Sequence, residues 1–137
     1  MEVTMLDRAH RAQVALPAAR TSPRDARQFL TATLHDWHVP EGPVEAACLL
    51  ATELVTNAVL HAGTPMELVL EADADHLRVE VVDGAEHMPV TRSYRSEPLG
   101  ITGRGLSLVR SIAKTWGVTP CEPGKSVWFE LPLARTG

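Results

Sequence analysis

Apolar residues recur every three or four positions along two stretches in the first half of the chain. In residues 23–37 and again in residues 43–61 they fall on one side of a helix with 3.6 residues per turn. Ser22 followed by Pro23 is typical of a helix start, with serine as N-cap and proline at the first helical position. Gly63 follows the second stretch, where a glycine commonly ends a helix. The pattern therefore predicts two helices separated by a proline-rich break.

The second half of the chain changes to a period of two, which is typical of strands with one buried face. A polar turn at residues 73–76 separates the first two alternating stretches and predicts an antiparallel hairpin. A second hairpin is predicted across residues 122–125, and a short strand before the first helix. The predicted strands are residues 13–16, 66–71, 77–83, 118–121 and 126–133.

Residues 85–102 separate these hairpins and show neither period. A loop of this length inside a compact domain is usually a lid, a binding loop or a disordered segment. A third helix is predicted at residues 106–116, again from apolar spacing. Together the elements predict an α/β fold: a two-layer sandwich whose mixed, mostly antiparallel sheet is covered by helices on one face. We expect a flexible arm at residues 1–11 and a single domain at residues 12–137, because the length suits one core.

Composition narrows the possible partners and location. The formal net charge of −4 and the lack of a dense basic run argue against direct nucleic-acid binding. Two cysteines, Cys48 and Cys121, do not make a disulfide framework. No apolar run approaches the roughly 20 residues that span a bilayer, and the first residues lack the apolar core of a signal peptide. We expect a cytoplasmic protein without membrane contact.

The central helix carries three polar residues on one stripe. Glu53, Asn57 and His61 follow each other at intervals of four, so each side chain turns by only about 40° relative to the last. Apolar residues border this stripe, and polar groups are costly to bury without partners. An amide oxygen such as that of Asn57 can bind Mg²⁺, and a carboxylate one turn away can orient and deprotonate an attacking hydroxyl. The spacing therefore predicts that the stripe lines a pocket for a polar ligand, although each of these residues alone is equally typical of a solvated helix surface. A nucleotide with its magnesium ion is a candidate ligand, for which His61 would be a structural or phosphate-side hydrogen-bond donor.

Two further places suit the same ligand. Asp83 ends an apolar strand, where a carboxylate can accept a hydrogen bond from an exocyclic amine, and Gly84 lets the backbone approach closely. An Asp-Gly pair is explained equally well by a turn. Gly103 and Gly105 precede a predicted helix, whose N-terminal N–H groups attract phosphate, although an ordinary loop-to-helix junction also uses glycine.

Three other kinds of site are not supported by the sequence: a P-loop, a metal site and the active site of a serine hydrolase. Gly124-Lys125-Ser126 imitates the end of a phosphate-binding P-loop, but Thr119 stands where the first glycine belongs and a strand follows. His35 and His38 lack a second cluster that would complete a metal site. No serine lies in the sharp turn that a serine hydrolase needs.

The joint pattern resembles the N, G1 and G2 boxes of the GHKL ATPase superfamily, and especially the small RsbW-type anti-sigma-factor serine kinases. The resemblance covers roughly residues 12–133 and implies the Bergerat ATP-binding fold, ATP with Mg²⁺, and an ATP lid at residues 85–102. It also implies a homodimer. The implied roles are Glu53 as catalytic base, Asn57 as magnesium ligand, Asp83 with Gly84 at the adenine, Gly103, Arg104, Gly105 and Leu106 at the phosphates, and Ser126 near the base on the closing strand.

The resemblance implies a regulatory protein serine/threonine kinase. Such a protein transfers the γ-phosphoryl group of ATP to a STAS-type anti-anti-sigma partner and binds a sigma factor. Ala85 and His87 occupy the two glycine positions of the G1 box, which motivates an alternative, a catalytically silent ATP-binding interaction module. A detached histidine-kinase-like catalytic domain is a third hypothesis, although no helical hairpin with a phosphoacceptor histidine is visible.

Overall fold

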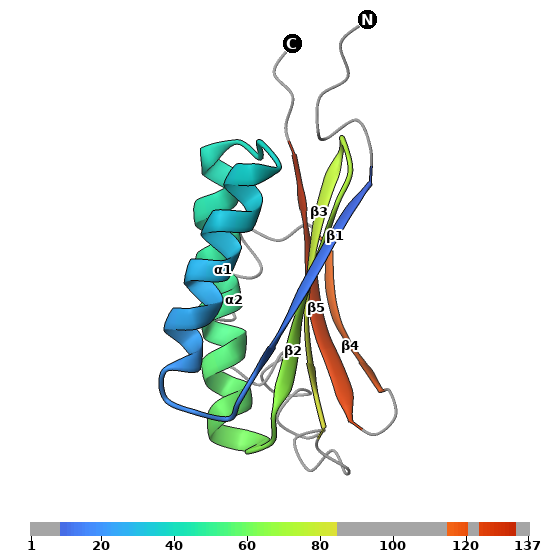
Figure 1. The fold of residues 1–137 in the computed structure, drawn as a ribbon. Helices are drawn as coiled ribbons and strands as arrows, with labels where there is room; N and C mark the ends of the chain where they lie inside the picture. The colour runs from blue at the N-terminus through green and yellow to red at the C-terminus, as the bar shows by residue number, and fades with distance from the viewer. Residues whose placement is uncertain (1–8, 85–114, 121–123, 134–137) are drawn as a thin grey trace, which may run out of the picture.

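The computed structural model describes residues 9–84, 115–120 and 124–133 of the chain. Within these residues, two helices cover one face of a five-stranded sheet, and the other face carries no helix (Figure 1). This is the predicted two-layer α/β sandwich. The elements are β1 (His10–Leu16), α1 (Ser22–Asp36), α2 (Glu41–His61), β2 (Met66–Ala72), β3 (His76–Asp83), β4 (Thr115–Pro120) and β5 (Lys125–Pro132).

The strand order is β1-β2-β3-β5-β4, and each pair of neighbours is antiparallel, so the mixed sheet expected from the sequence is antiparallel throughout its described part. Both predicted hairpins are present. In the β2–β3 hairpin, Met66 pairs with Asp83 and Ala72 with Leu77. The β3–β5 pairing places Asp83 opposite Lys125. This register brings the end of β3 and the start of β5 to the same end of the sheet.

Two boundaries differ from the sequence prediction. β1 begins at His10, so the last residues of the expected arm belong to the sheet. Thr115 and Trp116 lie in β4 rather than at the end of a helix, and Trp116 pairs with Phe129 of β5. Trp116 continues a helical spacing in the sequence, but as an aromatic residue it also suits a strand, and pairing with β5 decides its conformation. The rest of the predicted third helix lies outside the described residues.

The start of α1 corrects the predicted N-cap. Thr21 is the N-cap residue and makes no side-chain cap hydrogen bond, whereas Ser22 is the first residue of the helix. The Ser22 hydroxyl is fully buried and donates a hydrogen bond to the carbonyl of Pro17. The serine therefore fixes the turn between β1 and α1 instead of capping the helix.

Helix α2 is the apolar centre of the fold. It ends as predicted, because Gly63 follows with a φ of 66° and donates its N–H to the carbonyl of Ala58. Its buried side chains include Val44, Leu50, Leu54 and Val55. By length and composition α2 is the one helix of the described residues that could span a membrane, yet much of it is buried here as a core helix.

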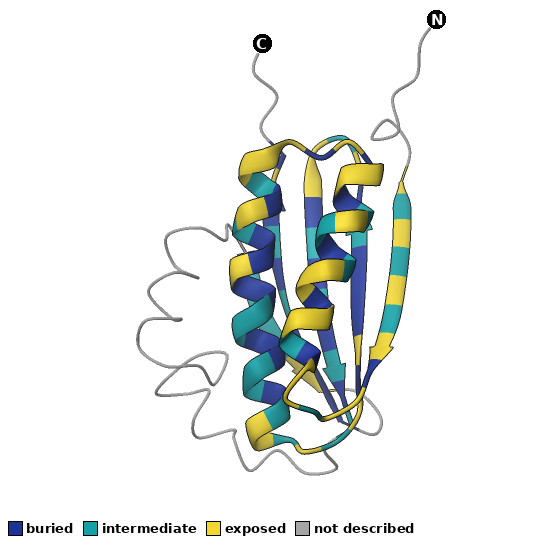
Figure 2. Cartoon of the chain, turned by 60° about the vertical axis from the view of Figure 1, so that its left-hand side comes forward, coloured by how far each residue is buried: buried dark blue, intermediate teal, exposed yellow. Residues whose placement is uncertain are grey.

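Burial follows the predicted periods. Figure 2 shows the buried sides of both helices turned towards the sheet and their exposed sides turned outward. Burial alternates along β3 and along β5 from Val127 onward: Val79, Val81, Phe129 and Leu131 pack under the helices, while the residues between them face away. A residue's position in the alternation therefore tells which face of the sheet its side chain occupies.

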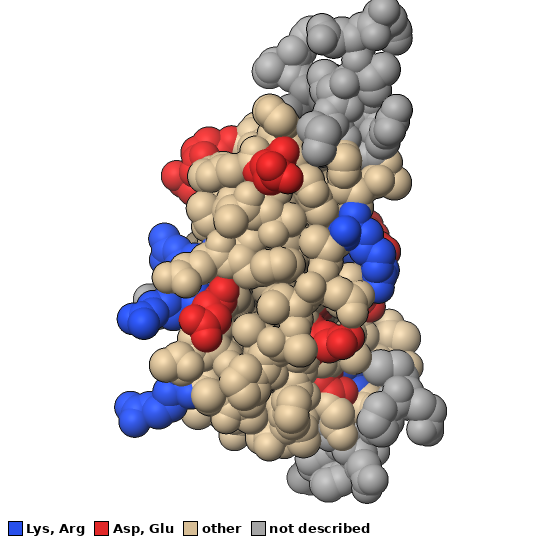
Figure 3. Space-filling model, in the orientation of Figure 1, with Lys and Arg blue, Asp and Glu red and all other residues tan. Residues whose placement is uncertain are grey.

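Charged side chains are dispersed on the face shown in Figure 3, where isolated acidic and basic groups are separated by uncharged atoms. Arg24 and Arg27 are exposed on α1. This face presents no continuous surface of one sign.

Candidate nucleotide site

Polar residues from α2 and from two strands meet around a small cavity between the helix and the sheet. Its polar lining consists of Asn57 and His61 of α2, Asp83 of β3 and Lys125 of β5. The remaining walls are apolar and include Leu54 and Ala58 of the helix and Val81 and Val127 of the sheet. The cavity has a volume of about 10 Å³, and roughly 10–15 Å³ is needed for one water molecule. The chain thus brings three residues of the predicted site, Asn57, His61 and Asp83, to one place.

The alternation of the strands explains why these side chains converge. Asp83 lies two residues after Val81 and shares its face of β3, under the helices. Its neighbour Gly84 donates a backbone N–H to the hydroxyl of Thr64 at 3.0 Å. Thr64 lies three residues after the end of α2, so this bond ties the connection between α2 and β2 to the end of β3. Asn57 and His61 lie on the last two turns of α2 and therefore face the end of that strand.

The most buried charged groups of the cavity form an ion pair. The Lys125 ammonium lies 2.8 Å from Oδ2 of Asp83, and the two side chains are 4% and 2% exposed. Among the described residues, they are the only charged side chains in the buried class. A charge inside a protein is costly unless it is paired, and here each charge has the other as a partner.

Lys125 is the residue that the sequence prediction missed. In the sequence this lysine stands out only within the P-loop-like run Gly124-Lys125-Ser126. The signal for its true place is the period of β5: Val127, Phe129 and Leu131 face the core, and two residues before Val127 the same face is occupied by Lys125. A lysine continuing an apolar row indicates a buried partner, which is Asp83 across the strand.

The same alternation corrects the expected position of Ser126. Its side chain lies on the face of the sheet away from α2, and its hydroxyl donates a hydrogen bond to Oε2 of Glu80 at 2.6 Å. Glu80 is on that outer face as well, opposite Trp128 of β5. Ser126 therefore does not lie near Glu53, because consecutive strand residues point to opposite faces.

Glu53 lies on α2 but lines a different hollow. It is partly exposed and borders a groove between the two helices together with Arg27 and Thr31 of α1. Asn57, one turn later, is partly buried and belongs to the cavity described above. The predicted stripe is thus divided, with its acidic end at the groove between the helices and its amide and imidazole at the cavity.

The predicted phosphate-binding segment, Gly103, Arg104, Gly105 and Leu106, lies outside the described residues, as does the predicted lid at residues 85–102. The described chain contains no group of three or more His, Cys, Asp or Glu side chains that could hold a metal ion. The cavity lining includes one side-chain amide, that of Asn57, whose oxygen is of a kind that Mg²⁺ accepts as a ligand.

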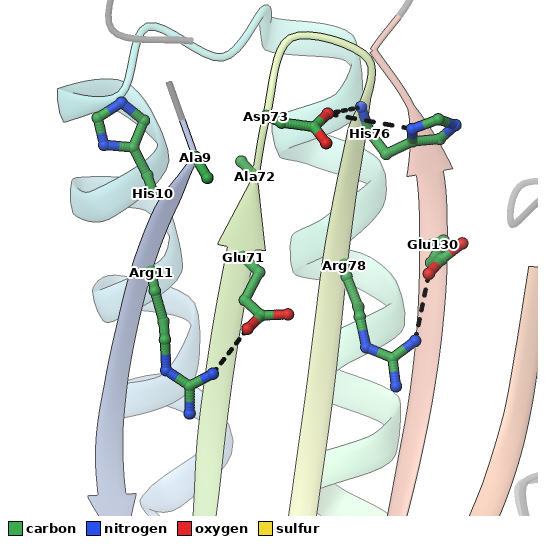
Figure 4. Close-up of a pocket in the computed structure, with 9 residues that line it drawn as sticks. All are labelled: Ala9, His10, Arg11, Glu71, Ala72, Asp73, His76, Arg78 and Glu130. Atoms are coloured by element: carbon green, nitrogen blue, oxygen red, sulfur yellow. Dashed lines mark hydrogen bonds and ion pairs between the residues drawn. The ribbon is translucent and has the colours of Figure 1, made fainter. Parts of the chain in front are cut away.

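A larger hollow of about 530 Å³ lies at the other end of the sheet, beside the β2–β3 turn (Figure 4). Its charged groups pair across strands: Arg11 with Glu71 at 2.6 Å, and Arg78 with Glu130 at 3.2 Å. Cross-strand pairs of this kind stabilise a sheet, and partly exposed ones contribute little. The hollow contains none of the predicted site residues.

The fold and the polar cavity under α2 define an α/β sandwich with a ligand site between helix and sheet. Comparison with known families identifies it further. The sequence model of the histidine kinase-like ATPase domain matches residues 16–130, which is most of the chain, and the protein belongs to this family. Membership implies ATP binding and indicates an ATP-using activity of the kinase type.

Solved structures support the fold. The structure titled "the RsbU and RsbW domains of Rv1364c from Mycobacterium tuberculosis" matches with a TM-score of 0.70 over 93% of the chain, at 16% sequence identity. The match covers 34% of the Mycobacterium chain, so the present chain spans about a third of that protein. At this identity the likeness shows the fold alone. A sequence search of curated proteins gave no match.

Proposed function

We propose that the protein is a cytoplasmic anti-sigma factor with ATP-dependent serine kinase activity towards a STAS-type partner. The observation that carries the proposal is the convergence of Asn57, His61 and Asp83 on one cavity between α2 and the sheet. Membership of an ATPase family and likeness to a structure that contains an RsbW domain support it. The sigma factor, the STAS partner and the homodimer rest on the resemblance to RsbW-type kinases.

Each residue has a role in this proposal. Asp83 would accept a hydrogen bond from the exocyclic amine of the adenine, and Asn57 would hold a magnesium ion, which would neutralise charge on the phosphates. His61, exposed at the end of α2, donates a hydrogen bond on the phosphate side. Glu53 removes the proton from the attacking serine hydroxyl. Its partly exposed place on α2 makes it accessible to a protein substrate.

The test is transfer of labelled phosphate from ATP to a purified STAS protein from the same source. We expect transfer by the wild-type chain and a loss of roughly 100-fold or more in Glu53→Ala, since general bases contribute about 10²–10⁴-fold. Glu45→Ala is the matched control, because Glu45 is an exposed glutamate on the same helix. Absence of transfer by the wild type, or equal transfer by wild type and Glu53→Ala, would refute the catalytic part of the proposal.

A second candidate function is a catalytically silent ATP-binding module. Glu53 supports it, because this carboxylate borders the groove between the helices and not the cavity of Asn57. Calorimetry combined with a turnover assay separates the two functions. Saturable ATP binding without hydrolysis or transfer supports the silent module, whereas rapid phosphotransfer refutes it.

A further inference from the structure

The ion pair at the bottom of the cavity presents two complementary groups to a ligand. A carboxylate can only accept hydrogen bonds, and a lysine ammonium can only donate them. In Asp83 and Lys125 these groups come from paired residues of neighbouring strands and lie 2.8 Å apart. Both line the cavity that also contains Asn57. An acceptor and a donor held side by side can form hydrogen bonds with two adjacent atoms on the edge of a nucleotide base.

The cost of burying this pair argues for more than a packing role. The neighbours of Lys125 and Asp83 on the same face are Val127 and Val81, both buried. Apolar residues in place of a buried ion pair are often as stable or more stable. The charged pair thus stands at the end of an apolar row of the sheet and lines the polar cavity beside Val81 and Val127.

We propose that Lys125 is a base-reading residue of the nucleotide site and acts together with Asp83. This inference rests on the proposed nucleotide site. Asp83 accepts from an exocyclic amino group, and Lys125 donates to the unprotonated ring nitrogen beside it. Adenine presents this order of groups at N6 and N1. Guanine presents the reverse order, a carbonyl oxygen beside a protonated nitrogen, and is disfavoured.

The present cavity holds about one water molecule, so a base enters only when the cavity widens. Lysine suits such a site, because its four-carbon stem is flexible and its ammonium carries three N–H donors. The ammonium keeps one bond to Asp83 and directs another to the base. The charge of Asp83 stays compensated throughout, so the pair is not broken when the ligand binds.

The test is the affinity of the full chain for ATP and for 1-deaza-ATP, which lacks the ring nitrogen that Lys125 reads. We expect 1-deaza-ATP to bind the wild type about 10- to 100-fold more weakly, the range for one hydrogen bond to a charged group. In Lys125→Met the two ligands should bind equally, within about threefold. Arg11→Met, which removes an exposed cation of the outer face, should keep the wild-type ratio and is the matched control.

Three results overturn the inference. They are equal binding of both ligands by the wild type, an unchanged ratio in Lys125→Met, and tighter ATP binding by Lys125→Met, which would make the lysine a competitor of the base. If the wild type binds no ATP at all, the proposed nucleotide site fails and this inference fails with it. If ATP binds without sensitivity to N1, only the role of Lys125 fails.

Because Lys125→Met leaves Asp83 without its lysine, a second measurement does not depend on that variant. A crystal structure of the wild type with a non-hydrolysable ATP analogue should place Nζ of Lys125 within hydrogen-bond distance of N1 of the adenine. A lysine turned away from the base, or a water molecule between the two atoms, overturns the proposal.

Discussion

Replacement of Lys125 by methionine is the perturbation whose effect on stability follows most directly from the structure. Methionine has a similar length and no charge, so the change leaves the carboxylate of Asp83 buried at 2% exposure without its cation. Removing one partner of a buried ion pair costs about 3–5 kcal/mol. For a domain of this length, that corresponds to a fall in Tm on the order of 10–20 °C.

The assay is urea unfolding of the wild type, Lys125→Met, Asp83→Leu and the double variant. The double variant removes both charges, and apolar replacements of a complete pair are often neutral or stabilising. We therefore expect it to be more stable than either single variant, with a coupling free energy of about 2 kcal/mol or more between the two sites. Arg11→Met should change stability by less than about 1 kcal/mol, because its ion pair with Glu71 is exposed.

Additive effects of Lys125→Met and Asp83→Leu would refute the reasoning. So would a loss below about 1 kcal/mol in Lys125→Met, the size of an exposed pair. Either result would mean that neither charge stabilises the other in the folded protein. The ion pair would then not explain how Asp83 and Lys125 are both buried at the cavity.

Three further predictions concern the sheet and its turn. Gly117→Ala should destabilise the protein by about 1–3 kcal/mol in urea unfolding, because a Cβ there would lie 2.8 Å from Cζ2 of Trp128; an unchanged midpoint would contradict this close contact. Phe129→Ala should cost about 3–5 kcal/mol, since Phe129 is fully buried in the core, and a loss below about 1 kcal/mol would contradict its central place. Two backbone N–H groups donate to the Asp73 carboxylate and lower its pKa below the ordinary 3.8, so its small stabilising effect is present above about pH 4 and is lost as the pH falls through the lowered pKa. The Tm difference between wild type and Asp73→Asn should therefore shrink between pH 5 and pH 2, as measured by thermal melts, and a constant difference would contradict the assignment.

Much of the fold follows from local periodicity. The hairpin of β2 and β3 and the helix that ends before Gly63 were predicted nearly to the residue, because each combines a clear period with a distinct stop signal. The predicted helix end at Trp116 was wrong, because the spacing of apolar residues cannot show that β5 is available as a pairing partner. Pairing between distant strands is a tertiary effect that overrides a local pattern.

The site was predictable only in part, for a related reason. Asn57 and His61 follow from the helical spacing, and Asp83 from its place at the end of a strand. Asp83 and Lys125 are 42 positions apart in the chain. They meet only because of the register between β3 and β5, which a local sequence pattern does not show. Register also decides which of Lys125 and Ser126 faces α2, since a shift of one residue exchanges the two faces.

The proposed function requires that α2 and the end of β3 together bind ATP with magnesium. The most direct test is a calorimetric titration of MgATP into the wild type, Asn57→Ala and, as matched control, Gln13→Ala, whose amide is exposed on the outer face of β1. We predict one saturable site in the wild type and Gln13→Ala, and an affinity about tenfold or more weaker in Asn57→Ala, the scale of a lost bond to a charged group. Absence of binding by the wild type, or equal affinity in all three proteins, would contradict the account.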